Sequence, residues 1–146
     1  MKKVLIAVLA VLLCFGAVLG FASCKEDEQE TTKTKVDINL ANMSDTMAYT
    51  TLYDIQENPT GYEGKTIKVK GYFSRDTFRG GSKVNHYFIS VYNPSCGKTD
   101  CIARTTFVWD GDLPDRGTET TVTGVVVVKR ENGNDYPELQ ATSVKF

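Results

Sequence analysis

Two segments with the same pattern decide the fold: Gly64-Lys65-Thr66-Ile67-Lys68-Val69-Lys70-Gly71 and Gly117-Thr118-Glu119-Thr120-Thr121-Val122-Thr123-Gly124. Each begins with a glycine, continues as an alternating strand, and reaches a second glycine inside that strand. Alternation with a period of two indicates a strand with one buried face. A glycine inside a strand weakens it unless the chain must bend there. A small closed sheet needs such bends, because its strands coil to serve both sides of the closure.

Five strands and one helix are expected around these segments. The expected strand ranges are 66–74, 85–92, 102–109, 118–129 and 136–144. Segment 75–83 is expected to be a loop, and Asn132-Gly133 a hairpin turn, since both residues tolerate a positive φ. A helix is expected to begin at Ser44-Asp45 and to end near residue 57, before Pro59.

The inward faces of these elements follow from the spacing of their apolar residues. In the first strand, Ile67, Val69 and Phe73 are expected to face inward, and in the second Tyr87, Ile89 and Val91. In the helix, Met47, Leu52 and Ile55 lie near one face. The first and fourth strands carry the repeated glycine pattern and are expected to be neighbours. We therefore expect a mainly β fold, a five-stranded OB-like Greek-key barrel with a short N-terminal helix. The alternative is another β-sandwich in which the glycines mark ordinary turns.

One stretch also resembles a known family. The segment Leu52-Tyr53-Asp54-Ile55-Gln56-Glu57-Asn58-Pro59-Thr60-Gly61-Tyr62-Glu63-Gly64-Lys65, with the strand after it, resembles small OB-fold domains of bacterial exported lipoproteins. The resemblance continues through the cysteine-bearing segment to Phe107-Val108-Trp109, Val122-Thr123-Gly124 and the last hairpin, and it covers residues 46–146. It implies the fold and an exported location, but no assigned activity.

The N-terminal 23 residues are expected to be a signal peptide. Lys2 and Lys3 precede an apolar run over residues 4–21, and small residues lead to Cys24. This order is typical of secretory signals, and a signal that ends at a cysteine resembles the lipobox of bacterial lipoproteins. Cys24 is therefore the predicted lipidation site. The alternatives are an uncleaved anchor helix and ordinary secretion, and each leaves the following domain outside the cytoplasm.

Two regions follow the predicted signal. Residues 24–45 are mostly polar and acidic and contain no aromatic residue, so we expect a flexible tether. Residues 46–146 are expected to be the folded domain, with equal numbers of basic and acidic residues. This balance favours no strongly charged partner. The expected protein is a membrane-anchored lipoprotein with an extracytoplasmic domain.

Two cysteines remain in the predicted domain, Cys96 and Cys101. An exported protein can keep a disulfide, so a structural bridge between them is expected. The alternative is a metal-binding or redox accessory module that uses these two cysteines and His86. A Cys-His nucleophile is also conceivable, but no catalytic motif accompanies it.

We expect a binding protein rather than an enzyme, with no cofactor. The acidic residues Asp110, Asp112 and Asp115 are too few for a calcium loop and indicate a solvated turn. OB barrels commonly bind ligands on the second and third strands and the flanking loops. The residues expected on that face are Lys68, Lys70, Tyr72, Arg75, Phe78, His86, Phe88 and Arg104. The expected partners are the membrane, through the lipid anchor, and an envelope protein, a peptide or a glycan. Nucleic acid is disfavoured by the exported location.

Overall fold

The computed structural model describes residues 35–79, 82–97 and 101–146. The predicted signal peptide, the predicted lipidation site Cys24 and the first part of the predicted tether lie outside these residues. Within the described part of the chain, no helix has both the length and the apolar character needed to cross a bilayer.

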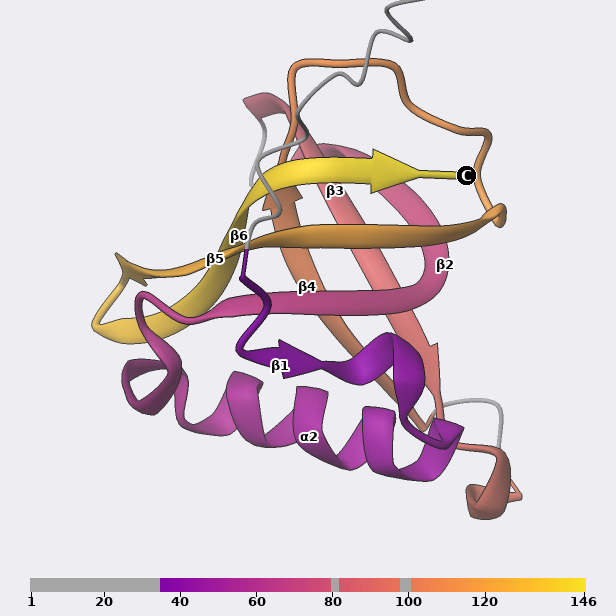
Figure 1. Ribbon diagram of the computed structural model, residues 1–146. Coiled ribbons are helices and arrows are strands. Elements are labelled where there is room, and N and C mark those ends of the chain that lie inside the picture. Colours follow the sequence, from indigo (N-terminus) through magenta and orange to yellow (C-terminus); the bar gives the residue numbers. More distant parts are fainter. Residues whose placement is uncertain (1–34, 80–81, 98–100) are drawn as a thin grey trace, which may run out of the picture. The chain divides into compact units, whose positions relative to one another are not determined.

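The fold is mainly β: one mixed sheet of six strands and one short α-helix (Figure 1). The strands are β1 (Ile38–Asn39), β2 (Thr66–Arg79), β3 (Ser82–Tyr92), β4 (Ile102–Val108), β5 (Glu119–Glu131) and β6 (Asn134–Lys145). Their order in the sheet is β1-β2-β3-β4-β6-β5. Strand β2 also pairs with β5, so β2 to β6 form a nearly closed ring.

The pairing of β2 with β5 confirms the neighbours expected from the repeated glycine pattern. The two strands run antiparallel, with Ile67 opposite Gly124 and Gly71 opposite Thr120. In the five-strand ring, β4 and β6 pair in parallel and the other neighbours are antiparallel. The ring therefore closes through the first and fourth of its strands.

Both glycines inside these strands allow a close approach of another backbone. A Cβ atom on Gly71 would lie 2.3 Å from the Ser90 carbonyl oxygen, and one on Gly124 would lie 2.7 Å from that of Gln140. Gly124 also adjoins a register shift between β5 and β6. Any other side chain would push the strands apart, so glycine is required at both positions.

The core fills the inside of the ring. The predicted inward residues Ile67, Val69, Phe73, Ile89 and Val91 are all buried, and the Tyr87 ring packs against Phe73 and Phe107. Burial alternates along β4 and β5, as a pleated sheet with one covered face requires. The inner face of the sheet was therefore predicted correctly from the period of two.

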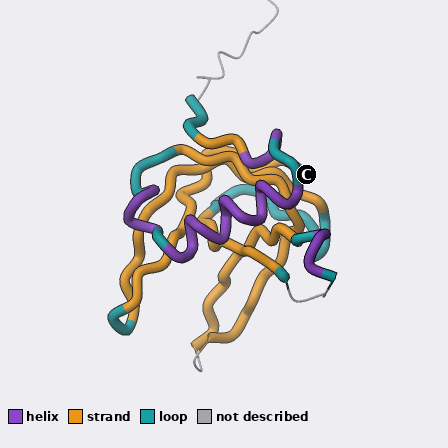
Figure 2. The backbone as a smooth tube through the Cα atoms, turned by 90° about the horizontal axis from the view of Figure 1, so that it is seen from below, coloured by secondary structure: helices purple, strands orange, loops and turns teal. Residues whose placement is uncertain are grey.

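The helix α2 (Asp45–Glu57) covers one end of the ring, and Figure 2 shows it running across the strands. The Ser44 hydroxyl accepts a hydrogen bond from the Met47 amide, which caps the first turn as predicted. Ala48, Leu52 and Ile55 are buried. Met47 is 59% exposed, so its predicted inward position was wrong. Ala48 lies on the same face as Leu52, four residues later, and its small side chain allows the helix to pack closely.

The folded domain begins before residue 46, which corrects part of the expected tether. Strand β1 pairs in parallel with β2, with Ile38 opposite Ile67. A 3-10 helix, η1 (Leu40–Asn42), then places Leu40 in the core, where it is 2% exposed. The Asp37 carboxylate accepts a hydrogen bond from the Thr66 amide. Residues 37–43 are therefore part of the domain, because two apolar side chains and one backbone ladder hold them.

The expected loop over residues 75–83 was also wrong. Strand β2 continues to Arg79 and β3 begins at Ser82, with Phe78 opposite Lys83 across a register shift. The polar residues at this point end the apolar alternation, but the backbone pairing of β2 with β3 continues through them. The helices η2 (Pro59–Tyr62) and η3 (Pro94–Cys96) complete the described elements.

The disulfide between Cys96 and Cys101 is present, as predicted, with the two Cα atoms 6.2 Å apart. It closes the connection between β3 and β4 just beyond their last pair, Tyr92 opposite Ile102. The Asn93 amide donates to the Cys101 carbonyl at 3.0 Å, so the ladder already holds the base of this loop.

Replacing both cysteines, C96S/C101S, is expected to lower the free energy of unfolding by about 2 kcal/mol, because the bridge closes only a short loop in the unfolded chain. Urea unfolding of the variant and of the oxidised parent measures the difference. The parent treated with reductant should match the variant. A loss beyond about 4 kcal/mol would contradict a purely local bridge.

Candidate ligand-binding groove

A groove with a volume of about 490 Å³ opens beside the outer face of β3 and β4. Its walls come from the C-terminal end of α2, from β2, and from the hairpin of β5 and β6. In Figure 1 the end of α2 and this hairpin lie on the same side of the ring. The residues that line the groove are Gln56, Glu57, Asp76, His86, Phe88, Arg104, Thr105, Thr106, Lys129, Glu131, Asp135, Tyr136, Pro137 and Glu138.

The outer face of β3 and β4 supplies an aromatic surface with an arginine on it. The Arg104 guanidinium lies 5.2 Å from the centre of the Phe88 ring, and the rings of Phe88 and His86 are 6.3 Å apart. His86 and Phe88 alternate with Ser90 along β3, so these side chains lie on one face of the sheet. Ser90 pairs with Arg104 of β4, which places Arg104 on the same face. A guanidinium over an aromatic face is attracted by the ring quadrupole. This contact holds Arg104 against the sheet.

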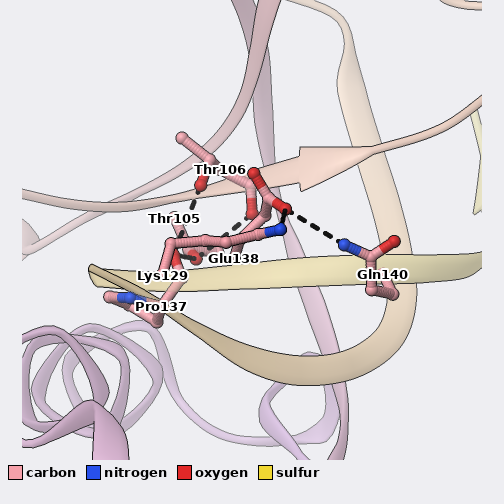
Figure 3. A network of polar contacts seen from close by, with 6 residues as sticks. All are labelled: Thr105, Thr106, Lys129, Pro137, Glu138 and Gln140. Atoms are coloured by element: carbon pink, nitrogen blue, oxygen red, sulfur yellow. Dashed lines mark hydrogen bonds and ion pairs between the residues drawn. The ribbon is translucent and has the colours of Figure 1, made fainter. Parts of the chain in front are cut away.

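The hairpin wall is joined to β4 by side-chain hydrogen bonds (Figure 3). The hydroxyls of Thr105 and Thr106 donate to the Pro137 carbonyl at 3.4 and 3.2 Å. Thr105 is 2% exposed, so its hydroxyl is a buried polar group with a partner. Glu138 binds Lys129 at 3.5 Å and accepts a hydrogen bond from the Gln140 amide at 3.0 Å. The wall is therefore fixed to the strand that carries Arg104.

The turn of the hairpin is held by its own ion pair. Arg130 donates from Nε and Nη2 to the two carboxylate oxygens of Asp135, at 2.6 and 2.8 Å. Asn132 and Gly133 between them have φ values of 52° and 83°, as expected for the predicted turn. The hydrogen bonds from Arg130 lower the pKa of Asp135 below its usual value. Asp135 therefore remains a carboxylate well into the acidic range.

The stabilising effect of this ion pair is expected to be lost only at acidic pH. Because the pKa of Asp135 is lowered in the folded state, its stabilising effect is complete above its unfolded pKa of about 3.9 and disappears as pH falls through the folded value. The melting temperatures of the parent and D135N should therefore differ above the unfolded pKa and converge as pH falls through the lower, folded pKa. Thermal unfolding followed by circular dichroism across this range measures the effect, and R130Q should behave in the same way. A difference that persists at the lowest pH would contradict it.

The groove contains more carboxylates than cations. Glu57, Asp76, Glu131, Asp135 and Glu138 line it, and the positively charged residues in the lining are Arg104 and Lys129. Asp135 and Glu138 have the partners described above. Across residues 35–79, 82–97 and 101–146, no ion pair or side-chain hydrogen bond engages Glu57 or Asp76. The groove is therefore net acidic.

Three of the predicted binding residues meet in the groove: His86, Phe88 and Arg104. Lys68 and Lys70 lie on the first half of β2, opposite Thr123 and Thr121 of β5. Lys70 pairs with Glu119 at 2.8 Å, and this hydrogen bond raises the pKa of Lys70. The Tyr72 ring contacts Tyr92 at 5.6 Å, towards the disulfide. None of these three residues lines the groove, because Lys68 and Lys70 lie beside β5 and the Tyr72 ring packs on Tyr92 at the end of β3.

Two further predicted residues belong to the second half of β2. Arg75 is exposed and opposite Tyr87, and its carbonyl accepts a hydrogen bond from Arg116. Arg75 does not line the groove. The Phe78 side chain lies outside the described residues, and only its backbone position opposite Lys83 is given. The predicted binding residues are therefore divided between the groove and other parts of the sheet.

The hairpin residues of the groove were missed. The sequence indicated a turn at Asn132-Gly133, and loops beside the second and third strands were expected to contribute to binding, but no residue of this hairpin was assigned to the site. The available signal was the density of charged residues on both sides of the turn, from Lys129 to Glu138. The parallel pairing of β4 with β6 brings this hairpin beside the strand that carries Arg104, and both line the groove.

The cysteines and His86 do not form one site. Cys96 and Cys101 are bonded to each other beyond the end of β3, and His86 lies six residues before the last residue of that strand, roughly 20 Å away at the rise of a strand. In the part of the chain that the structure describes, no three His, Cys, Asp or Glu side chains gather to hold a metal ion. At the acidic turn, the Trp109 indole donates to the Asp112 carbonyl at 3.1 Å, which holds the turn by a backbone contact.

No protein-family model matches the chain, and no curated protein is similar enough to count as a relative.

Proposed function

We propose that this protein is a lipid-anchored binding protein of the bacterial envelope, whose domain is an OB-like Greek-key barrel that presents a ligand groove outside the membrane. The single observation that carries the binding role is the position of the groove. In the ring, β3 and β4 are the second and third strands, and the β5–β6 hairpin joins the fourth to the fifth. OB barrels bind oligomeric ligands at this face and these loops.

The strand connections support the OB-like reading. The first strand of the ring pairs with the second and the fourth, and the third pairs in parallel with the fifth. The interior glycines at positions 71 and 124 lie where strands approach closely. A Greek-key barrel of five strands needs such positions, because its strands bend sharply at the corners.

The lipid anchor rests on the sequence of the first 24 residues. We expect metabolic labelling with an alkyne fatty acid in a bacterial host to mark the parent chain. C24S is expected to lose the label and to leave the membrane fraction, because the thiol that accepts the lipid is absent. C96S/C101S is the matched control and should keep the label. Equal labelling of C24S and the parent would overturn the anchor.

The binding role is tested with the groove itself. The full chain, purified in a neutral detergent, is applied to arrays of peptides and glycans, beside the variant F88A. Phe88 is only partly buried, so its removal should leave the fold intact. Signals that the parent gives and F88A loses support the proposal. Identical signals from both chains, or none from the parent, overturn it.

A metal or redox role for Cys96 and Cys101, which lie far from His86, is the less favoured proposal. Metal ligands and nucleophiles are thiolates, and a disulfide provides none. Thiol titration of the non-reduced protein distinguishes a structural disulfide from a metal or redox module. Zero free thiols in the pair supports the bridge as a structural element, whereas two free thiols with bound zinc would support the module.

A further inference from the structure

Resting on the proposed function, we infer that the groove selects a cationic ligand, an extended peptide segment rich in lysine and arginine. The inference combines the groove on β3 and β4 with three features of its walls: unpaired carboxylates, the end of a helix, and exposed aromatic surface. Each feature favours a positively charged donor over an anion or a neutral sugar.

The first feature is the presence of two carboxylates without a partner in the described part of the chain, those of Glu57 and Asp76. Glu57 belongs to α2 and Asp76 to β2, so they reach the groove from different elements. Neither has an ion pair or side-chain hydrogen bond among the residues described. Two other acidic side chains of the wall, Asp135 and Glu138, already bind Arg130, Lys129 and Gln140. A ligand therefore meets open acceptors, and a carboxylate covered without a partner would lose its hydration at high cost. A cation removes that cost.

The second feature is the end of α2 at Glu57. The last carbonyl groups of a helix carry partial negative charge and favour a cation. The last turn of α2 contains no basic residue, and it instead brings Glu57 to the groove. The helix end therefore adds to the field of the carboxylates. Complementary charge of this kind also speeds the encounter with a partner.

The third feature is the aromatic surface between the charges. Phe88 carries Arg104 on its face, and Tyr136 is 38% exposed at the hairpin. Lysine and arginine side chains cover such surface with their apolar stems while their charged ends reach polar groups. An arginine also stacks on an aromatic ring. The groove therefore offers both parts of a basic side chain a suitable contact.

The binding test uses three fluorescent probes with the full chain in a neutral detergent: octalysine, octaglutamate and chitohexaose. Fluorescence anisotropy should show binding of octalysine. E57Q/D76N should weaken it about tenfold, since two unpaired charges are removed at once. D110N/D112N is the matched control, with the same change in net charge at exposed residues away from the groove, and it should change affinity less than about twofold. Circular dichroism confirms that both variants are folded.

The outcomes separate the inference from the proposed function. Equal weakening by E57Q/D76N and by D110N/D112N would show attraction to overall charge only and would overturn the inference. Tighter binding of chitohexaose or octaglutamate, abolished by F88A, would also overturn it while leaving the groove as the binding site. Probe binding that F88A does not change would overturn the proposed function as well.

Discussion

A chain that begins at residue 46 is expected to be less stable by about 3–5 kcal/mol than one that begins at residue 35, because it lacks the buried Leu40 side chain, whose loss alone costs 2–5 kcal/mol. It also lacks the ladder between β1 and β2 and the Asp37 hydrogen bond to the Thr66 amide. Urea unfolding of both chains, monitored by the fluorescence of Trp109, measures the difference.

A point substitution isolates the main contribution. In the full chain, L40A should account for more than half of that loss, since it leaves the β1 backbone in place and empties one core position. K35A, at an exposed position of the same segment, is the control and should change stability by less than about 0.5 kcal/mol. Equal stability of the chains that begin at residues 35 and 46 would show that the segment contributes nothing to the core.

The start of the domain was misplaced because composition was judged over the whole segment 24–45. Its charges outnumber its apolar residues, and the alternation of a strand is confined to the short stretch Val36, Ile38 and Leu40. Averaged over the whole segment this stretch is hidden by the charges, but it is long enough to pair with the edge of an existing sheet. Local sequence could not show that edge, because it is formed by Thr66 to Lys68, far along the chain.

Within the sheet, prediction succeeded where burial enforces the period. Val69 and Ile89 lie inside because a shift of one residue would expose every apolar side chain of their strands. The continued pairing of β2 with β3 was missed because residues 75–83 show no apolar alternation, and a backbone ladder does not require one.

The candidate site was half predictable. His86, Phe88 and Arg104 were found because they share a strand phase and belong to neighbouring strands. Lys68 and Lys70 share that outward phase but meet β5 instead, because β2 changes partner near Gly71. The carboxylates of the hairpin could not be placed, since Glu138 reaches the groove through a parallel pair with Thr106, and no local pattern encodes such a pairing. As a result, the predicted face was basic and the observed groove is acidic.

The glycine that separates the two halves of β2 is expected to be the most sensitive position in the sheet. G71A should lower the free energy of unfolding by about 3 kcal/mol or more, because the new methyl group would meet the Ser90 carbonyl oxygen at 2.3 Å. That atom is backbone in a paired strand, so it cannot move without breaking the ladder between β2 and β3. For a domain of this size the loss corresponds to a fall in melting temperature of roughly 15 °C.

G61A is the control that distinguishes this clash from the general effect of adding a methyl group. Its Cβ atom would meet only the side chain of Asn58, at 3.1 Å, and Gly61 has no positive φ. It should shift the melting temperature by less than about 4 °C. G124A, whose Cβ atom would lie 2.7 Å from the Gln140 carbonyl oxygen, should resemble G71A. Because the two glycines lie on paired strands, their substitutions strain the same closure, and the double variant is expected to be unfolded. If G71A melted within a few degrees of G61A, the repeated glycine pattern would mark ordinary turns, and the ring would not depend on close approach at Gly71.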